Sequence, residues 1–175
     1  MSNRNKVIEN CIIRLADGDT SALDELYSTI KGDLYAYALS KSISKLDAED
    51  IMQDTFMLIF KNARLYTPSG RPMAWIITIE SNLINRHFQL KKRTINLDSD
   101  VLDSKASVDT LGLVIENRMV RELLDTLEED ERKIIVLHIV SNMKFREIAK
   151  VLNQPLSTVL SRYNRAIKKL KRKRR

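Results

Sequence analysis

The amino-acid sequence predicts an all-α protein with two small helical domains joined by a flexible acidic linker. Glycine and proline are rare, with four and three copies in 175 residues. Aromatic residues make up only 6% of the chain, and β-branched residues do not alternate with polar residues over long stretches, as they would in half-buried strands. This balance is typical of helical proteins.

Four helices are predicted in the first half of the chain. Residues Asp17–Asp19 break the first helix, and Thr20 or Ser21 can cap the second. A loop at Tyr66–Gly70 precedes the fourth helix, which Pro72 can open because proline suits the first helical turn. The expected helices are Val7–Ala16, residues 21 to about 42, Asp47–Ala63 and Pro72–Arg93.

An acidic segment follows at Asn96–Glu116. Its acids are Asp98, Asp100, Asp103, Asp109 and Glu116, and Lys105 is its only basic residue. Hydrophobic periodicity is poor here, and serine and aspartate recur, which favours a flexible linker. The sequence therefore divides into a first domain at 1–95, a linker at 96–115 and a second domain at 116–175.

Four further helices are predicted after the linker. Ile134–Val140 is apolar enough to be a buried strand, but the acids at Glu128–Glu131 favour a helix N-terminus, where they complement the helix dipole. Asn153 tolerates the left-handed conformation of a tight turn, and Pro155 can open the next helix. The expected helices are Asn117–Leu127, Glu131–Val140, Phe145–Leu152 and Pro155–Lys171.

The last two predicted helices have the pattern of a helix-turn-helix at Phe145–Leu170. Their apolar residues recur at helical spacing, and Ala149 is small where the two helices must cross closely. The opposite face of the second helix is polar and basic, and such a helix can enter the major groove of DNA. Its candidate DNA-binding residues are Ser157, Thr158, Ser161, Arg162, Arg165, Lys168 and Lys169. The alternative is a plain helical hairpin with a solvated basic face.

Composition narrows the classes of function. A formal charge of +7 suggests a polyanionic partner, and the tail Lys171–Arg175 adds sequence-independent attraction. Cys11 lies in an apolar run and is predicted to be buried, while His87 and His138 lack neighbours at metal-ligand spacing. We therefore expect no metal, no cofactor and no enzymatic activity, because no catalytic constellation is present either. No secretory or membrane-spanning segment is apparent, so we expect a cytoplasmic protein without membrane insertion.

Two separate motifs resemble regions 2 and 4 of sigma factors of the extracytoplasmic-function group. The first consists of Asp47–Phe56, Pro72–Ile79 and Asn82, and the second of Leu124–Lys171. The resemblance implies a bacterial subunit that binds core RNA polymerase, recognises the −35 duplex and melts the −10 element of promoter DNA. The open alternatives are a stand-alone helix-turn-helix regulator, which would bind operators as a dimer without polymerase, and a protein-interaction module whose basic faces never meet DNA.

An acidic face is predicted on the third helix. It carries Asp47, Asp50, Gln53 and Asp54, and Asp47 has the alternative role of capping the helix. The resemblance implies that this face binds the clamp helices of the largest polymerase subunit. It also implies that the second domain binds the flap region of polymerase. We expect the remaining side of the helix to pack, through Ile51, Phe56, Ile59 and Phe60.

The resemblance assigns −10 recognition to the fourth predicted helix and the loop before it, which open the DNA and hold an extruded base. The candidate residues are Trp75, Asn82, Arg86, Lys91, Lys92 and Arg93. Trp75 is interpreted as a core or wedge residue rather than a stacking platform. A core stripe is expected at Ile76, Ile79, Leu83 and Leu90. The sequence departs from the family at Glu80 and Ser81, where small and basic residues are usual, and at Arg86, where an acid is common.

In the second domain, Leu160 stands where a base-contacting arginine or lysine is frequent in the family. Its periodicity puts it at the edge of the core, so we expect Leu160 to pack rather than to read DNA.

The linker is either a plain tether or a segment that enters the nucleic-acid channel of polymerase. The resemblance also implies an anti-sigma protein as a partner, because family members are commonly held by one that covers both domains.

Overall fold

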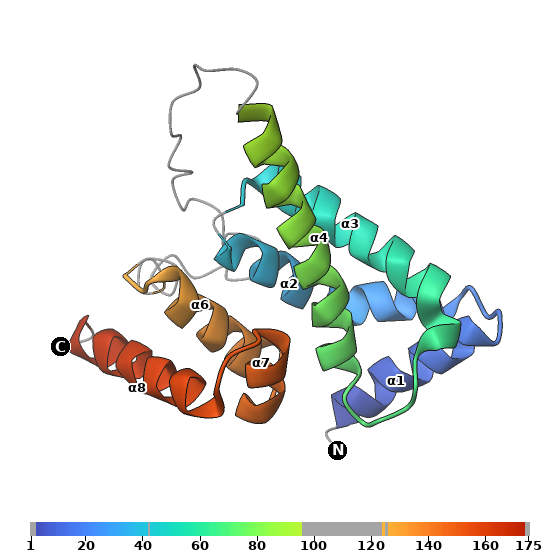
Figure 1. Ribbon diagram of the computed structural model, residues 1–175. Helices are drawn as coiled ribbons and strands as arrows, with labels where there is room; N and C mark the ends of the chain where they lie inside the picture. The colour runs from blue at the N-terminus through green and yellow to red at the C-terminus, as the bar shows by residue number, and fades with distance from the viewer. Residues whose placement is uncertain (1–2, 42, 96–123, 125, 174–175) are drawn as a thin grey trace.

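The structure of the protein, a computed structural model, describes residues 3–41, 43–95, 124 and 126–173. Every regular element in this part of the chain is helical, as the sequence predicts (Figure 1). The α-helices are α1 (Asn3–Ala16), α2 (Ala22–Ser40), α3 (Lys45–Asn62), α4 (Pro72–Ile95), α6 (Glu129–Ile135), α7 (Phe145–Val151) and α8 (Leu156–Lys173). The predicted linker at 96–115 lies outside the described residues, and so does most of the helix predicted at 117–127.

Helices α1 to α4 form one bundle around an aliphatic core. α2 packs against α1, α3 and α4, and α1 also packs against α3 and α4. Cys11 is buried on α1, as predicted. Large side chains from all four helices are fully buried, and removing their apolar surface from water stabilises the bundle. They include Ile8, Ile12, Leu26, Ile30, Leu34, Ile59, Ile76, Ile77 and Ile84.

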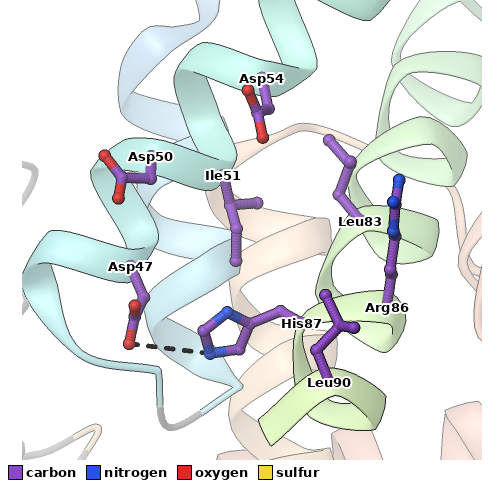
Figure 2. A pocket seen from close by; sticks show the side chains of 8 residues that line it. All are labelled: Asp47, Asp50, Ile51, Asp54, Leu83, Arg86, His87 and Leu90. Carbon is purple, nitrogen blue, oxygen red and sulfur yellow. Dashed lines mark ion pairs between the residues drawn. The ribbon is translucent and has the colours of Figure 1, made fainter.

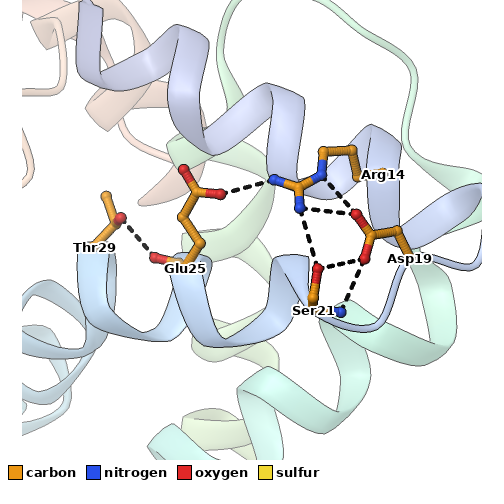
Figure 3. A network of polar contacts seen from close by, with 5 residues as sticks. All are labelled: Arg14, Asp19, Ser21, Glu25 and Thr29. Carbon is orange, nitrogen blue, oxygen red and sulfur yellow. Dashed lines mark hydrogen bonds and ion pairs between the residues drawn. The ribbon is translucent and has the colours of Figure 1, made fainter.

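A polar network fixes the turn between α1 and α2 (Figure 3). The guanidinium of Arg14 donates hydrogen bonds to Asp19 at 2.8 Å and to Glu25 at 2.7 Å. Ser21 occupies the N-cap position of α2, but its side chain makes no capping hydrogen bond. Its hydroxyl donates instead to Asp19, at 2.5 Å. The network therefore joins the end of α1 to the first turns of α2.

Helices α3 and α4 begin at residues whose chemistry suits a helix N-terminus. The Ser44 hydroxyl accepts a hydrogen bond from the N–H of Asp47 at 3.2 Å and donates one to the Asp47 carboxylate at 2.6 Å. Ser44 is therefore the N-cap of α3, and the alternative in which Asp47 caps this helix is wrong. Pro72 is the first residue of α4, as predicted.

The second bundle consists of α6, α7 and α8. α6 continues into a π-helical turn at Val136–Val140, so the ambiguous apolar stretch is helical, as predicted. Asn153 has a φ of 51°, which confirms the left-handed turn predicted between α7 and α8. The rings of His138 and Phe145 stack at 4.1 Å, and Phe145 meets the ring of Tyr163 at 4.8 Å. These rings join the π-helical turn, α7 and α8 into one core.

The two bundles lie against each other (Figure 1). α2 packs on α6 and on the π-helical turn, and α4 packs on α7. Arg4 of α1 forms an ion pair with Asp33 of α2 and donates to the carbonyl of Val140 in the second bundle at 3.4 Å. α8 packs on α6 and α7 at the outer side of the second bundle, which leaves its opposite face exposed.

Candidate nucleic-acid and protein interfaces

The acidic face of α3 carries three side chains that are free to meet a partner. Asp50, Gln53 and Asp54 are exposed, and none of their side chains pairs with another residue in the described part of the chain. Asp47 differs, because it is half-buried, bonds Ser44 and lies 3.7 Å from the Nε2 atom of His87. The structure therefore brings Asp50, Gln53 and Asp54 together on one surface and holds Asp47 within its own bundle.

A groove separates this acidic face from α4 (Figure 2). Its volume is about 320 Å³. Asp47, Asp50 and Asp54 line one wall, and Leu83, Arg86, His87 and Leu90 line the other. Residues that the sequence assigned to two different tasks, polymerase binding and DNA opening, thus share one groove with walls of opposite charge.

The exposed face of α3 continues beyond the acids into apolar side chains. Met57 is 51% exposed and Phe60 is 40% exposed. The expectation that Phe60 packs is wrong, because this exposure leaves a large part of its ring open to solvent. Ile51, Phe56 and Ile59 are buried, as expected. The face therefore combines carboxylates with apolar surface, a mixture that suits a protein partner.

The candidate −10 residues of α4 differ in their exposure to solvent. Asn82, Arg86 and Lys91–Arg93 are exposed. Trp75 is half-buried, and its ring lies 5.1 Å from the ring of Tyr66, in agreement with a core or wedge role. The expected core stripe holds at Ile76, which is fully buried, but fails at Leu90, which is 51% exposed. The last turns of α4 extend past the bundle (Figure 1).

Glu80 is a buried carboxylate that the sequence pattern did not reveal. It is fully buried on α4, and neither of its oxygens has a hydrogen-bond partner among the described residues. Burial raises its pKa well above the ordinary value, and the negative charge of Asp33 raises it further. Next to it, the hydroxyls of Ser81 and Tyr37 share a hydrogen bond of 2.8 Å. The departure of Glu80 and Ser81 from the family pattern thus falls inside the bundle.

The predicted DNA-binding residues of α8 divide into two groups. Ser157, Ser161, Arg165 and Lys168 are exposed, whereas Thr158, Arg162 and Lys169 are half-buried. The first group lies on the face turned away from α6 and α7. In that group, Arg165 and Lys168 make no ion pair with any residue that the structure describes. The two exposed cations are therefore available to phosphates or base edges.

Arg162 and Lys169 are held by acids of α6. The Nη1 atom of Arg162 lies 2.8 Å from a carboxylate oxygen of Asp130. The Nζ atom of Lys169 lies 2.7 Å from Glu131 and 3.3 Å from Glu128. The hydrogen bond that Lys169 donates to Glu131 raises the pKa of Lys169, while Lys133 and, to a smaller degree, Arg162 lower the pKa of Asp130. These two cations therefore contribute to the packing of the domain.

Sequence reasoning missed two members of the exposed face of α8. Leu160 is 37% exposed, so the expectation that it packs is wrong. Asn164 is also exposed and lies between Ser161 and Lys168 on the same face. Their spacing from Ser157, at three and seven residues, was the signal that could have identified them. We therefore add Leu160 and Asn164 to the candidate DNA-binding residues.

The described residues hold neither a helix suited to spanning a membrane nor a cluster of metal ligands. None of their helices combines the length and the apolar character that a membrane span needs. In the same part of the chain, histidine, cysteine, aspartate and glutamate side chains form no group of three that could hold a metal ion.

The fold and its surfaces define a class of protein. One bundle presents an acidic and apolar helix face, which suits a protein partner, and the other presents a helix-turn-helix with exposed cations, which suits duplex DNA. The amino-acid sequence itself then assigns the family. Residues 26–94 match Sigma-70 region 2, and residues 117–170 match Sigma-70, region 4. The chain belongs to the sigma-70 family and is an RNA polymerase sigma factor of the extracytoplasmic-function (ECF) group.

Individual relatives agree with this assignment. The chain is 28% identical over 152 residues to the ECF RNA polymerase sigma factor EcfG of Rhodopseudomonas palustris, covering 86% of this chain and 83% of the relative. It is 24% identical over 179 residues to the ECF RNA polymerase sigma factor SigW of Bacillus subtilis, covering 95% and 96%. A stand-alone helix-turn-helix regulator would lack region 2, so the match over the first bundle decides against that alternative.

A solved structure supports the fold. The sigma factor RpoE of Bartonella quintana, in complex with the anti-sigma factor NepR, superposes with a TM-score of 0.64 at 23% sequence identity. The superposition covers 85% of this chain and 94% of that one. The likeness confirms the all-helical fold that the sequence predicts.

Proposed function

We propose that this sigma factor works through three surfaces. The acidic face of α3 docks on the clamp helices of the largest polymerase subunit, through Asp50, Gln53 and Asp54. The loop before α4 and the exposed residues of α4 open the −10 element. The exposed face of α8 reads the −35 duplex, with the flap region of polymerase supporting the second domain. Residues 1–95 and 116–175 are the two working domains, and 96–115 links them.

The observation that carries this proposal is the pairing of two free surfaces of opposite charge in one chain. The carboxylates of Asp50 and Asp54 on one bundle and the cations of Arg165 and Lys168 on the other are exposed, and none of the four makes an ion pair with a residue that the structure describes. The first surface repels the DNA backbone, so its partner is a basic protein surface. The second attracts phosphate and, through arginine, can bond guanine in the major groove.

The −10 surface is supported by the position of the exposed residues on α4. Asn82 and Arg86 lie along one side of the helix, and Lys91–Arg93 extend the same helix with positive charge. Phosphate contacts of this kind offset part of the few kcal/mol that extrusion of a base costs. Trp75 supports the loop through the contact of its ring with the ring of Tyr66.

Reconstituted transcription tests the proposal. Core polymerase from the source bacterium, combined with this chain, is expected to initiate at defined sites in a library of genomic fragments, and run-off transcripts sequenced at their 5′ ends give those sites. Polymerase without the chain is the control. Start sites that are the same with and without the chain would overturn the proposal.

We further propose one more partner and a cellular location. An anti-sigma protein holds the factor inactive, as the relative from Bartonella quintana is held in a complex with NepR. The factor acts in the cytoplasm, where polymerase and promoters are, and it acts by binding rather than by chemistry of its own. Affinity purification of the tagged chain from its own bacterium, with and without cross-linking, is expected to recover polymerase subunits and a small regulatory protein.

A further inference from the structure

Glu9 of α1 holds the loop that precedes α4. One of its carboxylate oxygens, Oε1, accepts a hydrogen bond from the Tyr66 hydroxyl at 2.5 Å. The same oxygen accepts from the backbone N–H groups of Ser69 at 3.0 Å and Gly70 at 2.9 Å. Three donors from one short loop thus converge on a residue about 60 positions earlier in the chain.

The loop has few other means of keeping its shape. Thr67, Pro68 and Ser69 are exposed, and Gly70 adopts a φ of 70°, which only glycine adopts without strain. Two successive N–H groups that point at one anion resemble the backbone nests that bind phosphate and carboxylate. The carboxylate of Glu9 is therefore the group around which this backbone is arranged.

Docking of α1 does not require this carboxylate. Ile8, Cys11 and Ile12 of the same helix are fully buried in the first bundle, and they hold α1 in place by apolar packing. Among the described residues, the side-chain hydrogen bonds of Glu9 all run to this loop. Its contribution to the fold can thus be separated from its contribution to the loop.

The contact continues from the loop into α4. The ring of Tyr66, fixed at its hydroxyl by Glu9, lies 5.1 Å from the ring of Trp75 in the first turn of α4. Burial opposes ionisation of Glu9, but the hydrogen bonds from Tyr66, Gly70 and Ser69 outweigh it and hold its pKa below the ordinary value. The burial of Tyr66 and its bond to Glu9 raise the pKa of Tyr66 to about 12. The pair is therefore an ionised carboxylate and a neutral phenol at neutral pH.

We infer that Glu9 is a positioning residue for −10 recognition: it fixes the loop Tyr66–Gly70 in the shape that receives the extruded base. The inference rests on the proposed function of that loop. It places a determinant of promoter opening on α1, outside the segment 26–94 that matches region 2. Pre-organisation of the loop lowers the entropy that is lost when the base is captured, so weakening the anchor reduces discrimination at the base that the loop holds.

The test compares Glu9→Ala and Glu9→Gln with the wild type in the reconstituted holoenzyme. Two pools of a mapped native promoter are transcribed, one randomised across the −10 element and the other across the −35 element, and the transcripts are sequenced. Glu9→Ala is expected to reduce base preference about tenfold at one or two −10 positions, because hydrogen bonds to a charged group are lost. Glu9→Gln is expected to show a smaller loss, and preference in the −35 pool is expected to be unchanged.

Glu25→Gln is the matched control. Its carboxylate also accepts a hydrogen bond near α1, from Arg14 at 2.7 Å, but it belongs to the network at the turn between α1 and α2 (Figure 3). Tyr66→Phe is the second variant, since it keeps the ring against Trp75 and removes one of the three donors. Glu25→Gln is expected to keep wild-type preference in both pools, and Tyr66→Phe to lose part of the −10 preference.

The outcomes separate this inference from the proposed function. Wild-type −10 preference in Glu9→Ala overturns the inference, and so does an equal loss of −10 preference, −35 preference and core affinity, which would mark Glu9 as a residue of the fold alone. If the wild-type factor itself shows no preference in the −10 pool, the proposed function of the loop is wrong.

Discussion

The acidic face of α3 and the cationic face of α8 differ in more than the sign of their charges. On α3, one predicted residue, Asp47, is engaged inside its own bundle, and the three others are exposed and bond no side chain that the structure describes. On α8, two of the four predicted cations are engaged by acids of α6: Lys169 pairs with Glu131 and Glu128, whereas its neighbour Lys168 makes no ion pair with a described residue. Residue type alone therefore does not show which residues of a helix belong to an interface, since neighbouring residues on a helix point about 100° apart.

The largest expected effect is on the α3 face. Asp50→Lys combined with Asp54→Lys is expected to lower affinity for core polymerase by at least about 100-fold, because reversed charges at a buried interface each cost about 2 kcal/mol or more. Asp17→Lys combined with Asp24→Lys changes the net charge equally, at exposed sites just after α1 and in the first turn of α2, and is expected to bind normally. Fluorescence anisotropy of the labelled factor with core polymerase measures both. Equal losses in the two variants would contradict the assignment of the face.

The next effect separates two arginines of α8. Arg165→Ala is expected to weaken binding to the −35 duplex by about 1–3 kcal/mol and to relax preference at one base pair, since bidentate base contacts have that value. Arg162→Ala is expected to leave the base preference unchanged and to lower thermal stability slightly, because its partly exposed pair with Asp130 contributes about 0–1 kcal/mol. Binding to a randomised −35 duplex pool measures preference. If Arg162→Ala relaxed the base preference as much as Arg165→Ala, the ion pair between Arg162 and Asp130 would have to break when the protein binds DNA.

Leu160 gives a smaller effect with a specific chemical readout. An exposed apolar side chain on the reading face can contact the C5-methyl group of thymine. Replacing individual thymines of the −35 element with deoxyuridine, which lacks only that methyl group, is expected to weaken wild-type binding about fourfold at one position, the value of roughly one buried methylene. Leu160→Ala is expected to be insensitive to the same replacement. Equal sensitivity of the two proteins would show that Leu160 does not contact a thymine.

The smallest effect distinguishes two adjacent lysines by salt dependence. Lys168→Ala is expected to reduce the slope of log affinity against log salt concentration by about 1, because one phosphate contact is lost. Lys169→Ala is expected to leave the slope almost unchanged, since its charge is already balanced by Glu131 and Glu128. Titrations of the −35 duplex at several salt concentrations measure both slopes. Identical slopes for the two variants would remove the distinction between the free and the engaged side of α8.

The sequence by itself determined the helices and how they begin and turn. Pro72 at the start of α4 and Asn153 in the turn before α8 act through local backbone preferences, so neighbouring residues were enough to predict them. The apolar periodicity that buries Ile76 on α4 and Val159 on α8 is equally local. The same periodicity predicted exposed polar residues on both interface helices, such as Asp50 on α3 and Arg165 on α8.

The tertiary structure decided which residues of each face are covered. Phe60, Leu90 and Leu160 have the spacing of core residues, yet they are 40%, 51% and 37% exposed. Lys169 is engaged because α6, about 40 residues earlier in the chain, brings its acids alongside. The contact of Glu9 with the loop before α4 likewise joins residues about 60 positions apart. Helical spacing states which residues share a face, but what covers that face depends on the packing of distant segments.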